Sequence, residues 1–261
     1  MEKTGKRLVI FGVNPVMEKL RNSPEQVYEL MIAKGRERTA LSSIIEEARR
    51  RALPVRYVDP NMLNLLASGE LHQGVVATVA PYAYRPFAEL LQQLASAPAQ
   101  APILVLDGLT DPRNFGALLR SAEGAGVRHI VIPKDRSVGV TSAVVKSSAG
   151  AAHYLKIYRV SNLRRALQAL KESGCWILGL DAGAPDLLYD RHYSERVAVV
   201  LGSEGSGMRP LIRGECDFLV SIPMLGKITS LNVSVAGGIV LYELVRQRRQ
   251  GRASLGQSPA G

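Results

Sequence analysis

A short stretch in the second half of the chain combines an amide and a guanidinium at a spacing that could serve chemistry. Asn114 stands where a loop turns into a helix, and Arg120 follows six residues later, close to two helical turns on. Apolar residues occupy the opposite side of this helix, so the helix is suited to burial. An unpaired guanidinium on a buried helix would cost much free energy. We therefore expect Arg120 to have an anionic partner, either the carboxylate of Glu204 or a phosphate of a substrate.

Two loops further along the chain, one rich in glycine and one that begins with a glycine, predict the walls of one pocket. Residues 202–207 follow an apolar strand at 197–201, and residues 226–232, which include Ser230, come after a second strand at 218–222. Glycines at strand ends let a ligand lie against bare backbone, because no Cβ holds it away and a positive φ costs little. We expect both loops to contact the same ligand.

The first glycine loop directly follows a strand, as the glycine-rich loop of a dinucleotide site does, and such a site would indicate an oxidoreductase. It lies near the C-terminus, however, and no acidic ribose partner follows a second strand about 20 residues on, as the βαβ frame of such sites requires. The oxidoreductase hypothesis is therefore disfavoured.

Composition favours an anionic partner. The 261 residues include 33 basic and 23 acidic ones, a formal net charge of +10. Basic residues are spread along the chain, which fits two folded regions that both touch one polyanion such as nucleic acid. A generic basic surface explains the charge about equally well.

Several classes of protein are disfavoured. Cys175 and Cys216 are far apart, and the four histidines are scattered, so we expect no disulfide framework, metal site or hydrolytic triad. No run approaches the roughly 18 to 20 apolar residues that cross a bilayer. The first residues lack the apolar core of a secretory signal, so we expect a cytoplasmic protein without membrane contact.

The elements that must position these loops divide into four regions. Residues 1–82 alternate four strands with three helices, 83–102 read as a proline-containing linker, and 251–261 read as a disordered tail. Residues 103–250 alternate strands and helices, which predicts a mostly parallel α/β sheet with helices on both faces. Ligands of such sheets bind beyond the carboxyl ends of the strands, where both loops lie.

Three motifs in order resemble those of the SpoU, or TrmH, family of RNA ribose 2′-O-methyltransferases. They are NFGALLR at 114–120, LGSEGSG at 201–207 and SLNVSVA at 230–236. The first region, with FGVNPV at 11–16 and HQGVVA at 72–77, is similar to the small ribosomal-protein-like (L30e-like) substrate-binding domain of the family's ribosomal-RNA branch.

The resemblance implies a fold, a cofactor and an assembly. The fold would be a SPOUT-type α/β domain whose C-terminal segment makes a deep trefoil knot. S-adenosylmethionine would be held by the knot loops, and Gly202, Ile222 and Leu231 match the positions that hold it, largely through backbone groups. The family forms homodimers, and the small residues at 236–238 are compatible with close packing at such an interface or with an ordinary buried helix.

The resemblance also implies roles for the polar residues. Arg120 matches the arginine that the family is thought to use as a base, although a pKa above about 12 makes a phosphate clamp the more conservative role. Asn114 and Asn232 would orient the ribose or Arg120, Glu204 would pair with the guanidinium, and Ser230 would hydrogen-bond the substrate. The chemistry needs no metal.

The predicted function is S-adenosylmethionine-dependent 2′-O-methylation of a guanosine in large-subunit ribosomal RNA. The first region favours ribosomal RNA over transfer RNA, because the shorter transfer-RNA enzymes of the family lack it. A resistance-type ribosomal methylase acting on adenosine is a further alternative. A non-catalytic RNA-binding ribosome factor is disfavoured, since all five polar site residues are present.

Overall fold

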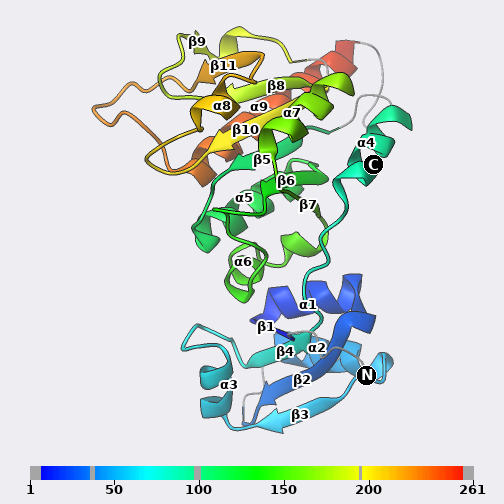
Figure 1. The fold of residues 1–261 in the computed structure, drawn as a ribbon. Coiled ribbons are helices and arrows are strands. Elements are labelled where there is room, and N and C mark those ends of the chain that lie inside the picture. The colour runs from blue at the N-terminus through cyan, green and yellow to red at the C-terminus, as the bar shows by residue number, and fades with distance from the viewer. Residues whose placement is uncertain (1–6, 36–38, 97–100, 194–195, 255–261) are drawn as a thin grey trace. The chain divides into compact units, whose positions relative to one another are not determined.

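The computed structural model describes residues 7–35, 39–96, 101–193 and 196–254 (Figure 1). The chain divides into two compact units. The first is formed from residues 1–83 and 139–154, and the second from residues 84–138 and 155–261. Within the described residues, no helix is both long and apolar enough to span a bilayer.

The first unit is a small α/β fold around a four-stranded sheet. Its strands are β1 (Leu8–Phe11), β2 (Val27–Ala33), β3 (Val55–Val58) and β4 (Val75–Val79), and its helices include α1 (Val13–Asn22), α2 (Thr39–Arg50) and α3 (Pro60–Leu66), with a 3₁₀ turn η1 (Pro24–Gln26). The order is β1-β4-β2-β3, with β2 and β3 parallel and the other pairs antiparallel. Phe11, Met31, Val58 and Leu63 form part of its core.

A segment from the second half of the chain completes this first unit. Helix α6 (Ser142–Ser147) and the 3₁₀ turn η2 (Ala151–His153) belong to it, and α6 contacts β1. Val144, Val145 and Ala152 are buried. The region predicted as continuous over 103–250 is therefore interrupted, because these apolar side chains are buried with the first unit.

The second unit is built on a seven-stranded sheet in which every pair is parallel. The strands are β5 (Ile103–Asp107), β6 (His129–Pro133), β7 (Lys156–Val160), β8 (Trp176–Leu180), β9 (Asp186–Leu187), β10 (Val197–Gly202) and β11 (Phe218–Ser221), in the order β7-β6-β5-β10-β8-β11-β9. The helices are α4 (Phe87–Ser96), α5 (Pro112–Gly124), α7 (Leu163–Glu172), α8 (Pro210–Arg213) and α9 (Val233–Ser254), with a 3₁₀ turn η3 (Leu188–Asp190).

Helices cover both faces of this sheet, as predicted. Ala198 and Val200 of β10 share a core cluster with Leu167 of α7. Side chains alternate along a strand, so Leu201 points to the other face. There it meets Gly237 of α9, the long helix that ends the described chain (Figure 1). Burial on both faces explains why the strands are nearly continuous apolar runs.

The expected linker and tail differ from the structure. Within 83–102, α4 packs into the core of the second unit, where Leu90 is fully buried and Phe87, Leu91 and Leu94 are partly buried. Their spacing of three and four residues makes one apolar helical face. Helix α9 continues to Ser254, so residues 251–254 of the expected tail are helical. Residues 97–100 and 255–261 lie outside the described part.

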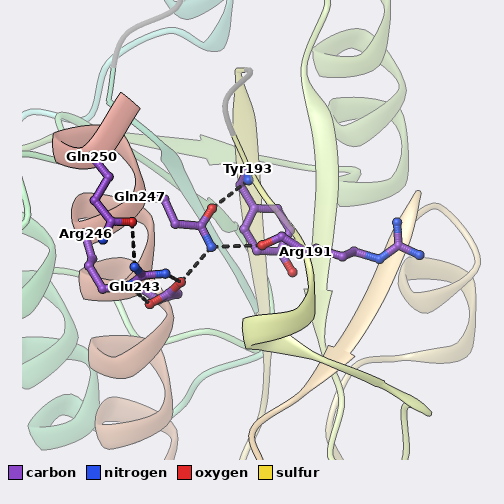
Figure 2. A network of polar contacts seen from close by, with 6 residues as sticks. All are labelled: Arg191, Tyr193, Glu243, Arg246, Gln247 and Gln250. Carbon is purple, nitrogen blue, oxygen red and sulfur yellow. Dashed lines mark hydrogen bonds and ion pairs between the residues drawn. The ribbon is translucent and has the colours of Figure 1, made fainter. Parts of the chain in front are cut away.

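A buried polar network fastens α9 to the segment that precedes β10 (Figure 2). The side chain of Gln247 accepts a hydrogen bond from the backbone N–H of Tyr193 (2.7 Å) and donates to the backbone oxygen of Arg191 (2.9 Å). It also donates to Glu243 (2.6 Å). The hydrogen bond from Arg246 to Glu243 lowers the pKa of this carboxyl. The network therefore fixes the C-terminal half of α9.

Replacing Gln247 by Ala is expected to destabilise the protein measurably. Gln247 is only 3% exposed, so its loss leaves the buried backbone N–H of Tyr193 and the partly buried backbone oxygen of Arg191 without this partner. Each such group costs about 1–3 kcal/mol, which urea unfolding of the whole chain would detect. Arg249→Ala, at an exposed position of the same helix outside this network, is the control and should change stability by less than about 0.5 kcal/mol. Equal effects of the two variants would contradict this account of the network.

Candidate active site

A cavity of about 690 Å³ lies at the carboxyl ends of β8, β10 and β11. Its walls come from the end of β8, from the glycine loop after β10 and from the segment between β11 and α9. Of the residues predicted to hold the methyl donor, Gly202, Ile222 and Leu231 all line it. Of the predicted catalytic residues, Glu204, Ser230 and Asn232 line it as well. Residues predicted from separate motifs thus meet in one cavity.

The glycine loop is tightly closed on itself. Ser203 and Gly207 exchange two backbone hydrogen bonds of 3.0 Å each. A Cβ added to Gly202 would lie 2.1 Å from the carbonyl carbon of Gly207, so only glycine allows this return of the chain. Gly205 and Gly207 have φ of +80° and +67°, which side chains disfavour. The loop therefore presents backbone groups to the cavity.

Three predicted catalytic residues form one hydrogen-bonded cluster at the mouth of the cavity. The side-chain amide of Asn232 donates to the Oδ1 of Asn114 (3.0 Å) and to the Oε1 of Glu204 (3.3 Å). The amide of Asn114 donates to Glu204 as well. This asparagine–glutamate cluster, Asn114, Glu204 and Asn232, brings together the loops after β5, β10 and β11.

Helix starts hold both asparagines of the cluster. Asp111 is the N-cap of α5, where it accepts from the backbone of Arg113 (2.9 Å) and from the side-chain amide of Asn114 (2.9 Å). Asn232 precedes α9 and accepts from the backbone N–H of Ser234 (2.9 Å). Such local caps restrict the side chains before any ligand arrives.

Arg120 does not join the cluster, and Glu204, one of the two partners expected for it, is bonded to the two asparagines instead. Arg120 is exposed on α5, and among the described residues no carboxylate or other group is its partner. Six residues turn a helix by about 600°, which leaves Arg120 roughly 120° around α5 from Asn114. Glu204 instead accepts from the two asparagine amides. The guanidinium is thereby available for a ligand.

Sequence patterns did not reveal two ion pairs near the cavity. Arg213 donates from Nε to Asp181 Oδ2 (2.6 Å), and both residues line the cavity. This hydrogen bond lowers the pKa of Asp181, which stays ionised at neutral pH. The buried Asp107 pairs with Arg209 at the end of the glycine loop. An acidic residue at the end of an apolar strand was the only local signal for either carboxylate.

Neither a metal centre nor a reactive thiol is evident. In the ranges that the structure describes, no group of three or more His, Cys, Asp or Glu side chains is placed to hold an ion. Burial raises the pKa of Cys175 to about 11 and that of Cys216 to about 12, so both thiols are protonated at neutral pH. The polar groups at the cavity are therefore amides, hydroxyls, carboxylates and guanidinium groups.

Comparison with known proteins identifies the class as RNA methyltransferases. The chain belongs to the SpoU rRNA Methylase family, whose model matches residues 101–242. A second model, described as RNA 2′-O ribose methyltransferase substrate binding, matches residues 9–85. The family predicted from the three motifs and from the first region is confirmed.

Curated relatives match along nearly their whole length. The chain is 44% identical to the 23S rRNA (guanosine-2′-O-)-methyltransferase RlmB of Xylella fastidiosa, covering 92% of this chain and 96% of that protein. It is 41% identical to RlmB of Escherichia coli K12, covering 92% and 98%. Among solved structures, the SpoU methyltransferase AviRb from Streptomyces viridochromogenes in complex with AdoMet is 25% identical, with a TM-score of 0.76 and coverage of 94% and 92%.

Proposed function

We propose that this protein is an S-adenosylmethionine-dependent 2′-O-methyltransferase that acts on a guanosine of large-subunit ribosomal RNA. The single observation that carries the proposal is the meeting of the asparagine–glutamate cluster with the backbone-lined cavity at one edge of a parallel sheet. Near full-length similarity to the RlmB enzymes supports the substrate, and a net charge of +10 suits a polyanion.

The cavity fits S-adenosylmethionine in size and chemistry. Its volume lies in the range of roughly 300–1,000 Å³ that small-molecule sites occupy. Gly202 offers backbone without a side chain, and Ile222 and Leu231 offer an apolar wall, which suits an adenine edge that needs N–H and C=O partners. These three residues would hold the donor. When bound, its sulfonium supplies a methyl group that is already activated for transfer.

The asparagine–glutamate cluster supplies orientation at the mouth of the cavity. Each asparagine amide is engaged by Glu204, and each asparagine also takes part in a helix-start contact, so their rotamers are restricted. Restriction of this kind lowers the entropy cost of aligning a ribose hydroxyl with its reaction partner. Ser230, exposed on the cavity wall, can donate to the same ribose or its phosphate.

Arg120 suits a phosphate of the RNA. An exposed guanidinium without a carboxylate partner keeps its planar donor fork for bidentate pairing with phosphate oxygens. The role of base asks the same group to give up a proton at neutral pH, against its intrinsic pKa above about 12. We therefore favour the clamp, and the base remains the alternative.

Methyl transfer to two RNA substrates tests the proposal. The full chain with labelled S-adenosylmethionine is incubated with unmodified large-subunit ribosomal RNA and, in parallel, with bulk transfer RNA. Label in ribosomal RNA alone is expected, because a substrate-binding region accompanies the catalytic one. Label in transfer RNA alone would indicate that the substrate is transfer RNA and not ribosomal RNA. Donor binding without label in either RNA would favour a non-catalytic RNA-binding factor.

We also propose that the protein acts as a homodimer through an apolar surface on the segment between β11 and α9 and on α9 itself. Leu225, Ile228, Val235 and Tyr242 are 101%, 73%, 51% and 53% exposed. All four lie on the segment between β11 and α9 or on α9 itself, and exposed apolar surface of this kind marks interaction sites. The nearby Gly237 is explained within the chain, since its Cβ would lie 2.4 Å from Leu118. The deep trefoil knot implied by the family resemblance also stays a prediction.

Charge placed on this apolar surface is expected to separate the dimer. Val235→Glu combined with Ile228→Glu should reduce the mass seen by light scattering from that of two chains to that of one, because paired carboxylates would be buried without partners. Leu65→Glu, at another exposed apolar position of α3, should leave the mass unchanged. A wild-type chain that is monomeric at the concentrations used for assays would contradict the proposal.

A further inference from the structure

A fully buried carboxylate lies directly beside the glycine loop. Asp107 is the last residue of β5, and its side chain has no exposure. Its Oδ2 accepts from the backbone N–H of Arg209 (2.8 Å), and its Oδ1 accepts from Arg209 Nε (2.7 Å) and lies 2.5 Å from the terminal guanidinium nitrogen. One residue therefore satisfies this carboxylate from both its backbone and its side chain.

This ion pair joins the two ends of the glycine loop. In the sheet, Asp107 lies in register opposite Gly202, where the loop begins. Arg209 lies just beyond Met208, where the loop ends and α8 begins. The loop between them is closed by the Ser203–Gly207 backbone pair. The ion pair thus fixes the far end of the loop against the strand that precedes the first motif.

The loop carries parts of the site that need accurate placement. Its backbone lines the cavity, and Glu204 within it accepts hydrogen bonds from Asn114 and Asn232. A shift of the end of the loop would move both the cavity wall and this carboxylate. Small displacements of groups that orient reactants are costly, of the order of 10²-fold in rate for about 1 Å.

Packing does not account for the arginine. Its side chain is 46% exposed and also borders a second cavity, of about 640 Å³, so it is not needed to fill a core. Desolvation of Asp107, in contrast, demands a cation and hydrogen-bond donors. Two guanidinium nitrogens at Oδ1 and the backbone N–H at Oδ2, all from one residue, meet that demand in a single geometry.

We propose that Asp107 and Arg209 are positioning residues, which together hold the loop of residues 203–208 in the shape that binds the methyl donor and presents Glu204 to Asn114 and Asn232. The proposal rests on the proposed function, in that the ligand of the loop is S-adenosylmethionine. Neither residue contacts the reacting atoms in this account.

Asp107→Asn tests the proposal in the full-length chain. An asparagine side chain has one oxygen that accepts and one NH₂ group that donates. It can therefore accept from either the backbone N–H or the guanidinium of Arg209, and its NH₂ group would face the other donor. We expect the Kd for S-adenosylmethionine, measured by calorimetry, to rise about ten- to hundredfold, as loss of a charged hydrogen bond worth about 1.5–3 kcal/mol implies. Amide hydrogen exchange of residues 203–208 should speed up in the same variant.

Glu215→Gln is the matched control. It weakens the ion pair between Arg164 Nε and Glu215 Oε1, which has a similar length of 2.6 Å, an arginine 52% exposed and a glutamate 13% exposed. Neither residue lines the donor cavity. A general loss of stability from a broken ion pair would affect both variants, whereas a positioning role changes donor affinity and loop exchange only in Asp107→Asn.

The outcomes separate this proposal from the proposed function. A Kd within twofold of wild type, with unchanged exchange in the loop, would overturn the positioning role. A wild-type chain that binds no S-adenosylmethionine would overturn the proposed function, while the exchange comparison still tests the loop. If Asp107→Asn does not fold, Arg209→Lys takes its place, because this half-exposed side chain leaves no cavity. Lysine keeps the charge but not the fork, so an affinity loss smaller than that of Arg209→Ala is expected.

Discussion

Replacing Arg120 by Ala is expected to lower kcat for methyl transfer by about 10²- to 10³-fold, the cost of removing one charged group that acts on the transition state. The affinity for S-adenosylmethionine should be unchanged, because Arg120 does not line the donor cavity. Stability should also be unchanged, since the guanidinium is exposed and has no partner among the described residues. Single-turnover kinetics with saturating donor would measure the effect.

Arg120→Lys distinguishes the two roles of this residue. A lysine still binds phosphate as a point charge. If Arg120 is a phosphate clamp, Arg120→Lys should therefore keep part of the activity, and its remaining defect should be mainly a raised KM for RNA. A base acts in the chemical step, so its replacement should lower kcat and leave KM for RNA unchanged. Arg128→Ala is the control, because Arg128 is exposed at the amino end of β6, the edge of the sheet opposite the cavity. A full rate in Arg120→Ala would exclude both roles.

Gly202→Ala is expected to abolish donor binding, with a rise in Kd of more than about 100-fold. The new Cβ would lie 2.1 Å from Gly207 and 2.2 Å from the backbone nitrogen of Met208, and backbone atoms of a closed loop cannot yield as a side chain can. Opening the loop would remove the cavity wall on which the adenine edge is expected to rest. Calorimetric titration with S-adenosylmethionine measures the loss.

Gly226→Ala is the control for this glycine effect. Gly226 begins the second loop, residues 226–232, and an added Cβ would meet nothing within 4 Å. Its Kd for the donor should stay within about twofold of wild type, as for surface substitutions that disturb no contact. Similar losses in both variants would show that the loops are sensitive to any added side chain and would contradict the specific role of Gly202.

Local patterns were sufficient to predict the sheet and the cavity. The apolar runs that became β5 and β10 are buried on both faces, and the glycine run after β10 lines the cavity at the carboxyl ends of β8, β10 and β11. Each depends on a few neighbouring residues, and glycine at such turns has a direct physical reason. The family motifs then indicated Asn114, Glu204 and Asn232 one by one.

The hydrogen-bond partners of these residues depend on the order of the strands in the sheet. Hydrophobic periodicity predicts the strands but not their order. Glu204 was one of two partners expected for Arg120, the other being a substrate phosphate, but β10 lies beside β5 and Glu204 bonds Asn114. Asp107 and Arg209 are 102 residues apart, so no local signal links them. Long-range pairing of polar groups is decided by the tertiary fold.

Two differences in domain organisation have contrasting causes. The sequence contains the apolar face of α4, formed by Phe87, Leu90, Leu91 and Leu94. The neighbouring prolines and small residues nevertheless favoured the interpretation of this segment as a linker. The apolar Val144 and Val145, by contrast, would suit any core. Only the path of the chain assigns them to the first unit.

The most direct test of the central claim is the chemical position of the transferred methyl group. Large-subunit ribosomal RNA labelled by the full chain is hydrolysed with alkali, which needs a free 2′-hydroxyl to cleave the next phosphodiester. The account predicts label in an alkali-resistant dinucleotide that contains 2′-O-methylguanosine, and its loss with Arg120→Ala. Label that appears in mononucleotides after alkali would place the methyl on a base and contradict the account.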